Sequence, residues 1–132
     1  MKILPLMLSV TLAWSSILSS VAADASAGKK QDKLRHVVAF KFKTSTTPEQ
    51  VKQVENAFRD LKKKMPQIAG YEWGLNNSPE NRNRGCTHGF ILTFRTEKDR
   101  DAYLVHPEHK EFGKLVGPLL EDVFVIDFWT QD

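Results

Sequence analysis

Residues 34–43 read Leu-Arg-His-Val-Val-Ala-Phe-Lys-Phe-Lys, and this stretch decides the fold of the 132-residue chain. Two sets of side chains alternate along it, and in an extended backbone each set faces one side. One side carries His36, Val38, Phe40 and Phe42, and the other carries Arg35, Val37, Ala39, Lys41 and Lys43. Alternation of this kind predicts a β-strand with one side turned toward a core.

Toward the C-terminus, the chain continues with a helix, two strands, an interrupted helix and a last strand. The first helix begins after Thr47, because Pro48 follows this cap and Gln50 completes a capping box, and Pro66 ends it. The later elements are predicted at 68–75, 86–95, 96–116 with a break at His106-Pro107, and 123–129. The order β-α-β-β-α-β predicts an α+β, ferredoxin-like fold, with a four-stranded antiparallel sheet and helices on one face.

The other face of the predicted sheet is expected to be apolar and uncovered. It carries Val37, Ala39 and Ile91, and the last strand offers apolar side chains in both directions. An exposed apolar sheet face usually marks an interface, although scattered surface hydrophobic residues are the alternative. We therefore expect a homodimer in which two sheet faces pack together to form a dimeric α/β barrel.

Toward the N-terminus, residues 1–27 differ from the rest of the chain. A positive start precedes a mostly apolar run, and small residues then allow cleavage after Ala23, Ala25 or Ala27, which is the layout of a secretory signal peptide. An uncleaved membrane anchor is the alternative, but a proline and several serines interrupt the run. We expect a polar lead-in at 28–32, a folded domain at 33–132, a secreted or periplasmic location, and no stable membrane insertion after cleavage.

The composition excludes several classes of protein. There are 19 Lys and Arg against 16 Asp and Glu, and three of the cations, Lys29, Lys30 and Lys33, lie at the N-terminal edge of the predicted domain. The folded part is therefore near neutral, and its basic residues are not interleaved with aromatic ones, so we expect no nucleic-acid partner. The one cysteine, Cys86, excludes an internal disulfide.

Four histidines and a tyrosine form the one informative set of polar residues. We expect the first and third strands to be central, adjacent and parallel, which would bring His36 and His88 to the same end of the sheet. A bend in the second helix would let Tyr103, His106 and His109 converge there. The sequence thus predicts a pocket between sheet and helices for a small, partly apolar molecule. Its expected lining is Val38, Phe40, Phe58, Phe90, Leu92, Phe112 and Leu115.

Three interpretations of these polar residues remain open. An imidazole with a pKa of about 6.5 and a phenol with a pKa of about 10 could move a proton beside a carbonyl without a cofactor. The same side chains could instead be structural, in a non-catalytic stress or structural protein. Histidines gathered at one end could also bind zinc adventitiously, but the His-Glu-x-x-His pattern is absent, and we expect neither a functional metal nor a cofactor.

Four segments, at 34–43, 83–88, 103–109 and 125–128, occur in an order that resembles one known family. That family is the stress-responsive dimeric α/β-barrel (Dabb) domain, and Tyr-Leu-Val-His-Pro-Glu-His at 103–109 is the most specific segment. The resemblance implies a ferredoxin-like protomer, a homodimer through the sheet faces and a pocket between sheet and helices. The family includes plant stress proteins and cofactor-free polyketide cyclases. The resemblance to the cyclases implies that Tyr103 and His109 act as an acid–base pair. It also implies that His36, His88 and His106 lie at other polar positions of the pocket.

Overall fold

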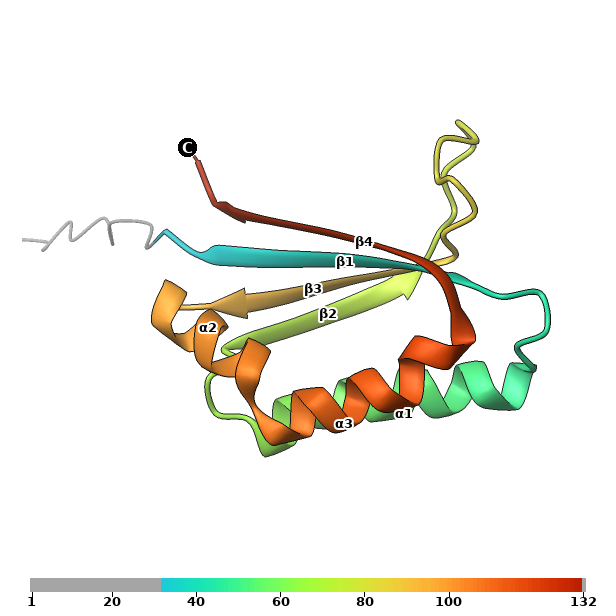
Figure 1. Cartoon of the computed structure of the whole chain (residues 1–132). Coiled ribbons are helices and arrows are strands. Elements are labelled where there is room, and N and C mark those ends of the chain that lie inside the picture. The colour runs from blue at the N-terminus through green and yellow to red at the C-terminus, as the bar shows by residue number, and fades with distance from the viewer. Residues whose placement is uncertain (1–31, 132) are drawn as a thin grey trace, which may run out of the picture.

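The computed structural model describes residues 32–131, and its elements follow the predicted order (Figure 1). The strands are β1 (Leu34–Phe42), β2 (Gly70–Leu75), β3 (His88–Phe94) and β4 (Leu120–Trp129). The helices are α1 (Pro48–Lys64), α2 (Glu97–Val105) and α3 (Pro107–Val116), and a short 3-10 turn, η1 (Gly117–Leu119), leads into β4. The predicted α+β, ferredoxin-like fold is confirmed. The predicted signal peptide, and all of the lead-in except its last residue, lie outside the described residues.

The four strands form one antiparallel sheet in the order β2-β3-β1-β4. β1 and β3 are central and adjacent, as expected, but the prediction that they are parallel is wrong. The reason is the connectivity. α1 carries the chain back so that β1 and β2 run in the same direction, and the following loop reverses it into β3. His36 therefore pairs with Leu92 and His88 with Phe40, so the two histidines lie at opposite ends of the sheet.

The four strands differ from their predicted bounds by one to three residues, and β1 ends one residue early, at Phe42. β2 and β3 are each shorter than expected, and β4 begins earlier, at Leu120 instead of Val123. The early start of β4 follows from pairing, because Leu120 lies opposite Phe42 beyond a register shift in β1. Pairing of this kind depends on a strand that lies far away in the sequence, so local periodicity does not reveal it.

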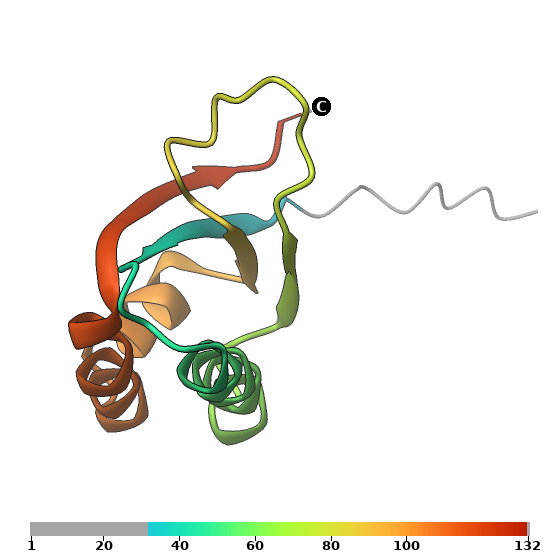
Figure 2. The same ribbon diagram turned by 90° about the vertical axis from the view of Figure 1, so that its right-hand side faces the viewer.

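All three helices lie against one face of the sheet, here called the inner face (Figures 1 and 2). α1 begins as predicted, because Thr47 and Gln50 form a reciprocal capping box. The break between α2 and α3 is also as predicted. His106 is extended there, and its Nδ1 accepts a hydrogen bond from the Glu108 N–H, so His106 caps α3. None of the helices in residues 32–131 is long and apolar enough to cross a membrane.

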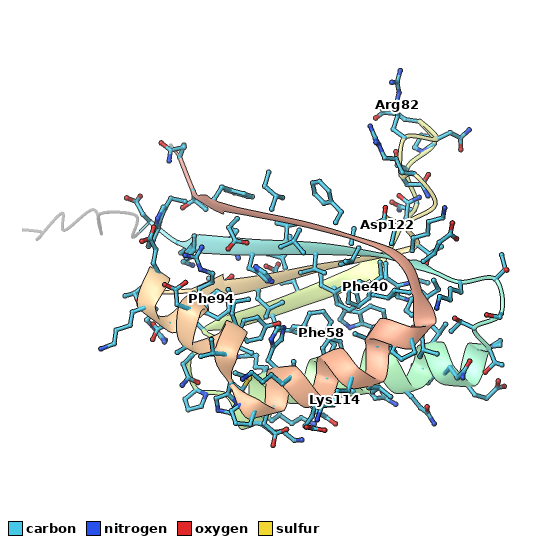
Figure 3. The ribbon with its side chains drawn as sticks, in the orientation of Figure 1. Phe40, Phe58, Arg82, Phe94, Lys114 and Asp122 are labelled. Atoms are coloured by element: carbon cyan, nitrogen blue, oxygen red, sulfur yellow. The ribbon has the colours of Figure 1, made fainter. Side chains whose placement is uncertain are left out.

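The core fills the space between the inner face and the helices. At its centre, the ring of Phe58 lies 4.5 Å from that of Phe90 and 4.6 Å from that of Phe112. Figure 3 shows Phe40 and Phe58 in this layer. Six of the seven residues expected to line a pocket are buried here, and Leu115 is instead 38% exposed. These rings contact one another, so they pack as a core.

The opposite face, here called the outer face, is apolar and is not covered by any helix of the described residues. It carries Val37, Ala39, Ile91, Phe124, Ile126 and Phe128, and the last three are each about half exposed. The loop at 76–87 rises from this side of the sheet, with Arg82 near its tip (Figure 3). The sequence-based expectation of an uncovered apolar face is therefore confirmed.

Candidate functional site

One end of the inner face brings three of the predicted site residues together. The ring of Tyr103, on α2, lies 4.3 Å from the ring of His109, on α3, and 5.7 Å from that of His36, on β1. Phe94 of β3 packs against Tyr103 at 5.3 Å. The break between α2 and α3 allows this meeting, since it redirects the chain between positions 103 and 109. We call His36, Tyr103 and His109 the Tyr103 cluster.

Tyr103 is the most deeply buried member of the cluster, with 1% of its surface exposed. Burial raises the pKa of its phenol above the ordinary value. The hydroxyl therefore stays protonated throughout the physiological pH range. It can donate a hydrogen bond or a proton, and it does not rest as a phenolate.

His109 is held in one tautomer by the backbone. Its Nδ1 lies 3.1 Å from the carbonyl oxygen of Leu104, and because a carbonyl can only accept, Nδ1 carries the proton. The Nε2 lone pair is then left to accept a proton from elsewhere. Burial lowers the pKa of His109, whereas the hydrogen bond to the Leu104 carbonyl raises it. The effect of burial is larger, so the pKa is lowered and the ring is neutral near pH 7. These conditions suit a general base.

His36 is oriented by a carboxylate that is itself held by an arginine. His36 Nδ1 lies 2.6 Å from Asp127 Oδ1, and Arg100 Nη1 donates to Asp127 Oδ2 at 2.8 Å. Burial tends to raise the pKa of the Asp127 carboxyl, but the bonds from Arg100 and His36 outweigh it and hold that pKa below its usual range. The ionised carboxylate therefore accepts from His36 Nδ1, and Nε2 of this ring has no hydrogen-bond partner among residues 32–131.

His88 lies at the other end of the inner face. Its Nε2 is 3.3 Å from Glu55 Oε1, and its Nδ1 is 2.8 Å from the Thr87 hydroxyl oxygen. The ring of Trp73 stacks on it, with centroids 6.1 Å apart and 4° between the ring planes. The expectation that the imidazoles surround one pocket mouth is therefore wrong for His88, because β1 and β3 are antiparallel.

The other predicted site residues lie outside the Tyr103 cluster. His106 caps α3, and the ligand-binding residues Val38, Phe40, Phe58, Phe90 and Phe112 are buried in the core. Their binding roles stay predictions. Among residues 32–131, no three His, Cys, Asp or Glu side chains are arranged to hold a metal ion.

Sequence reasoning missed Asp127 and Arg100 as members of this site. A signal for Asp127 was present, since it is the one polar residue in the apolar run 123–129. Its partner could not be read from the sequence, because His36 is 91 residues away. Arg100 gave no signal, because a cation in a helix normally points to solvent.

A cavity of about 890 Å³ lies on the outer face, between the sheet and the loop at 76–87. Its floor is a row of small residues, because Gly74 pairs with Gly89 and Gly89 pairs with Ala39 in adjacent strands. This row leaves room that larger side chains would fill. Two predicted ligand-binding residues, His88 and Phe90, also line the cavity.

A family model described as the stress-responsive A/B barrel domain, Dabb, matches residues 34–130. The chain belongs to this family. Among curated proteins, the Dabb chain is 30% identical over 95 residues to the stress-response A/B barrel domain-containing protein HS1 of Arabidopsis thaliana, a match that covers 72% of the chain and 87% of that relative. It is 25% identical over 95 residues to olivetolic acid cyclase of Cannabis sativa, covering 72% of the chain and 94% of the cyclase.

Solved structures agree with this assignment. The hydroxynitrile lyase from Passiflora edulis matches with a TM-score of 0.73 and 25% identity, covering 77% of this Dabb chain and 96% of the lyase. Three further matches are described as dimeric proteins with a ferredoxin-like fold, at TM-scores of 0.61 to 0.66. The chain is therefore similar to proteins that are named as enzymes and to solved structures that are described as dimeric.

Proposed function

We propose that this Dabb protein binds a small, partly apolar molecule and moves a proton on it with Tyr103 and His109, without a cofactor. One observation carries the proposal. A buried phenol lies against two imidazoles, and the Nδ1 atom of each is already engaged by another group. Directed proton transfer needs such fixed tautomers, because they decide which nitrogen accepts.

The reaction class that fits is proton abstraction beside a carbonyl, as in an aldol-type cyclisation or an isomerisation. Nε2 of His109 takes a proton from the carbon next to the carbonyl, and the electron pair moves onto the oxygen to give an enolate. The Tyr103 hydroxyl donates a hydrogen bond to that oxygen and stabilises the developing charge. In a cyclisation, the enolate carbon attacks a second carbonyl, and the protonated His109 gives its proton to the new alkoxide. In an isomerisation, the enolate takes its proton directly from the protonated His109. His36, oriented by Asp127, packs on the Tyr103 ring and keeps the phenol in position.

The names of two relatives support an enzymatic role. One is called a cyclase and another a lyase, and the match covers more than nine-tenths of each. Only the class of chemistry, and no particular substrate, is carried over to this chain.

We also propose that the protein is an exported homodimer. Without a partner, the apolar side chains of Phe124, Ile126 and Phe128 would stay about half exposed to water. Neighbours described as dimeric support the pairing itself, and the exposed apolar side chains of the outer face are the reason to place it there. Export to a secreted or periplasmic location rests on the layout of residues 1–27 alone.

A non-catalytic stress or structural role is the alternative, and one observation favours it. Tyr103 is 1% exposed, and Phe94 and the two imidazoles pack around it. In that case the Tyr103 cluster would hold α2 and α3 to the sheet and would not touch a ligand.

Deuterium exchange into the methyl group of acetophenone, followed by NMR in D₂O, separates the two roles. If the site is catalytic, Tyr103→Phe and His109→Ala each lower the catalysed rate by about 100-fold or more, while the melting temperature changes little. Lys110→Ala, at an exposed position of α3, is the control and keeps both properties. A loss of about 2 kcal/mol or more of unfolding free energy in both site variants would favour the structural role. Native mass spectrometry of the purified protein would identify a co-purifying ligand.

A further inference from the structure

Tyr71 carries a buried hydroxyl that has no partner. Its Oη is buried and makes no hydrogen bond to any residue of the described range 32–131. The rings of Phe58 and Phe90 pack on the Tyr71 ring, and their centroids lie 5.6 Å and 6.4 Å from its centroid. A buried unpaired hydroxyl costs free energy comparable to a lost hydrogen bond, and phenylalanine would avoid that cost. A tyrosine at this position therefore points to an acceptor that comes from outside residues 32–131.

Tyr71 lies in the same cross-strand row as part of the Tyr103 cluster. It pairs with Leu92, Leu92 pairs with His36, and His36 pairs with Asp127. Side chains in one row project from the same face of a sheet, so Tyr71 and His36 both belong to the inner face. Neighbouring strands are about 4.8 Å apart, which separates the two backbones by roughly 10 Å. This separation is close to the length of a substituted benzene ring.

The surroundings of Tyr71 also limit the chemistry of the acceptor. Burial raises the pKa of its phenol, so the hydroxyl is protonated and donates. The charges of Arg59 and Glu55 act on this pKa in opposite directions, and each acts less than burial does, so burial dominates and desolvating an unpaired anion is expensive. A neutral carbonyl-type oxygen fits these conditions best.

We propose that Tyr71 is a specificity-determining residue whose hydroxyl donates a hydrogen bond to a carbonyl-type oxygen at the far end of the substrate. This inference rests on the proton-transfer function proposed above and names its substrate class. The substrate carries two oxygen functions joined by an apolar body. One oxygen lies at the reacting end beside Tyr103, and the other lies at the Tyr71 end.

Two probes that differ in one group test this assignment. They are 1,4-diacetylbenzene and 4-isopropenylacetophenone, in which C=CH₂ replaces one of the two C=O groups. Isothermal titration calorimetry on the purified protein gives the Kd of each. The wild-type protein is expected to bind the diketone about tenfold more tightly, because its second oxygen pairs the buried hydroxyl. Tyr71→Phe is expected to remove this preference, and Lys110→Ala, the control at an exposed position of α3, is expected to keep it.

Several results would overturn the assignment. They are equal binding of the two probes by the wild-type protein, a preference that survives in Tyr71→Phe, and no saturable binding of either probe. Stability is the second readout, because removing an unpaired hydroxyl leaves the melting temperature unchanged or raises it. A clear decrease would mean that the hydroxyl has a partner within the chain, and would also overturn the assignment. Failure of the proton-transfer function is seen separately, as a protein that prefers the diketone but does not exchange its methyl protons.

Discussion

Two histidine–carboxylate pairs lie at opposite ends of the inner face, and their surroundings differ. Nδ1 of His36 is 2.6 Å from Asp127, and Nε2 of His88 is 3.3 Å from Glu55. The side chains of both histidines are equally buried, at 7% exposed. At the first end, the pair lies beside a buried phenol and a second imidazole; at the other end it does not. The neighbours of such a pair, and not the pair itself, decide what chemistry it can support.

The His88 end is built for packing. Trp73 stacks on the imidazole, and Phe42 meets it edge-on at 5.2 Å. Glu55 projects from α1, so its bond to His88 ties this helix to β3. These contacts account for a buried imidazole at this position without a ligand, while the predicted ligand-binding role of His88 stays a prediction.

The largest expected effect is on stability, from His88→Ala. The substitution leaves a hole beside Trp73 and Phe42 and leaves Glu55 without its imidazole partner, so we expect a loss of about 3 kcal/mol of unfolding free energy. Urea denaturation measures this loss. The exchange rate per folded molecule should stay at the wild-type value. A stable protein with a lost exchange rate would reverse the roles assigned to the two ends.

The second-largest expected effect is on the exchange rate, and it distinguishes Asp127 from Glu55. Asp127→Asn removes the ionised partner of His36, and the exchange rate is expected to fall about tenfold as the imidazole loses its fixed tautomer. Glu55→Gln is the matched control at the other end and should lower stability by about 1 kcal/mol without changing the exchange rate. Equal changes in exchange rate for both variants would show that the two ends are not distinct.

The pH dependence of stability distinguishes His109 from the carboxylates. The pKa of His109 is lowered by burial in the folded protein, so below about pH 6.5 the unfolded chain takes up this proton first and stability falls. The lowered pKa values of Glu55 and Asp127 act at lower pH, since their contributions are present above about pH 4 and are lost below it. In His109→Ala, the unfolding free energy should therefore change less between about pH 7 and pH 5 than in the wild-type protein. Its fall below about pH 4 should be unchanged. A curve that flattens only below that range would contradict the assignment.

The smallest effect concerns the cations that hold each carboxylate. Lys52 binds Glu55 at 3.0 Å but is 65% exposed, so Lys52→Gln should cost less than about 0.5 kcal/mol. Arg100 is 21% exposed and bonds to Asp127, and Arg100→Gln should cost about 1 kcal/mol and slow the exchange reaction. Thermal unfolding of both variants checks that Arg100→Gln loses more stability than Lys52→Gln. The reverse order would mean that Arg100 does not hold Asp127 in place.

How much the sequence could predict depended on how local each signal was. The capping box at Thr47 and the break at His106 lie within a few residues of the structures that they specify, and both are present. The direction of β3 relative to β1 has no such local signal, because it depends on two connections, and its prediction was wrong. The partnership of His36 and Asp127 spans 91 residues and arises only from the strand order.

The predicted pocket lining shows a different limit. Phe40, Phe58 and Phe90 were expected to surround a ligand, and they are buried against one another. A periodic pattern of aromatic residues identifies the inner face, but it does not distinguish a packed core from the wall of a cavity, because both need apolar side chains. The unpaired hydroxyl of Tyr71 is visible only once the surrounding contacts are known.

We propose that proton transfer belongs to the Tyr103 cluster and not to the His88 end. A comparison of the acetophenone exchange rates of His109→Gln and His88→Gln, under conditions in which both proteins are folded, tests this proposal. We expect a fall of about 100-fold or more for His109→Gln and a change of less than about twofold for His88→Gln. Equal rates in the two variants, or a loss confined to His88→Gln, would contradict it.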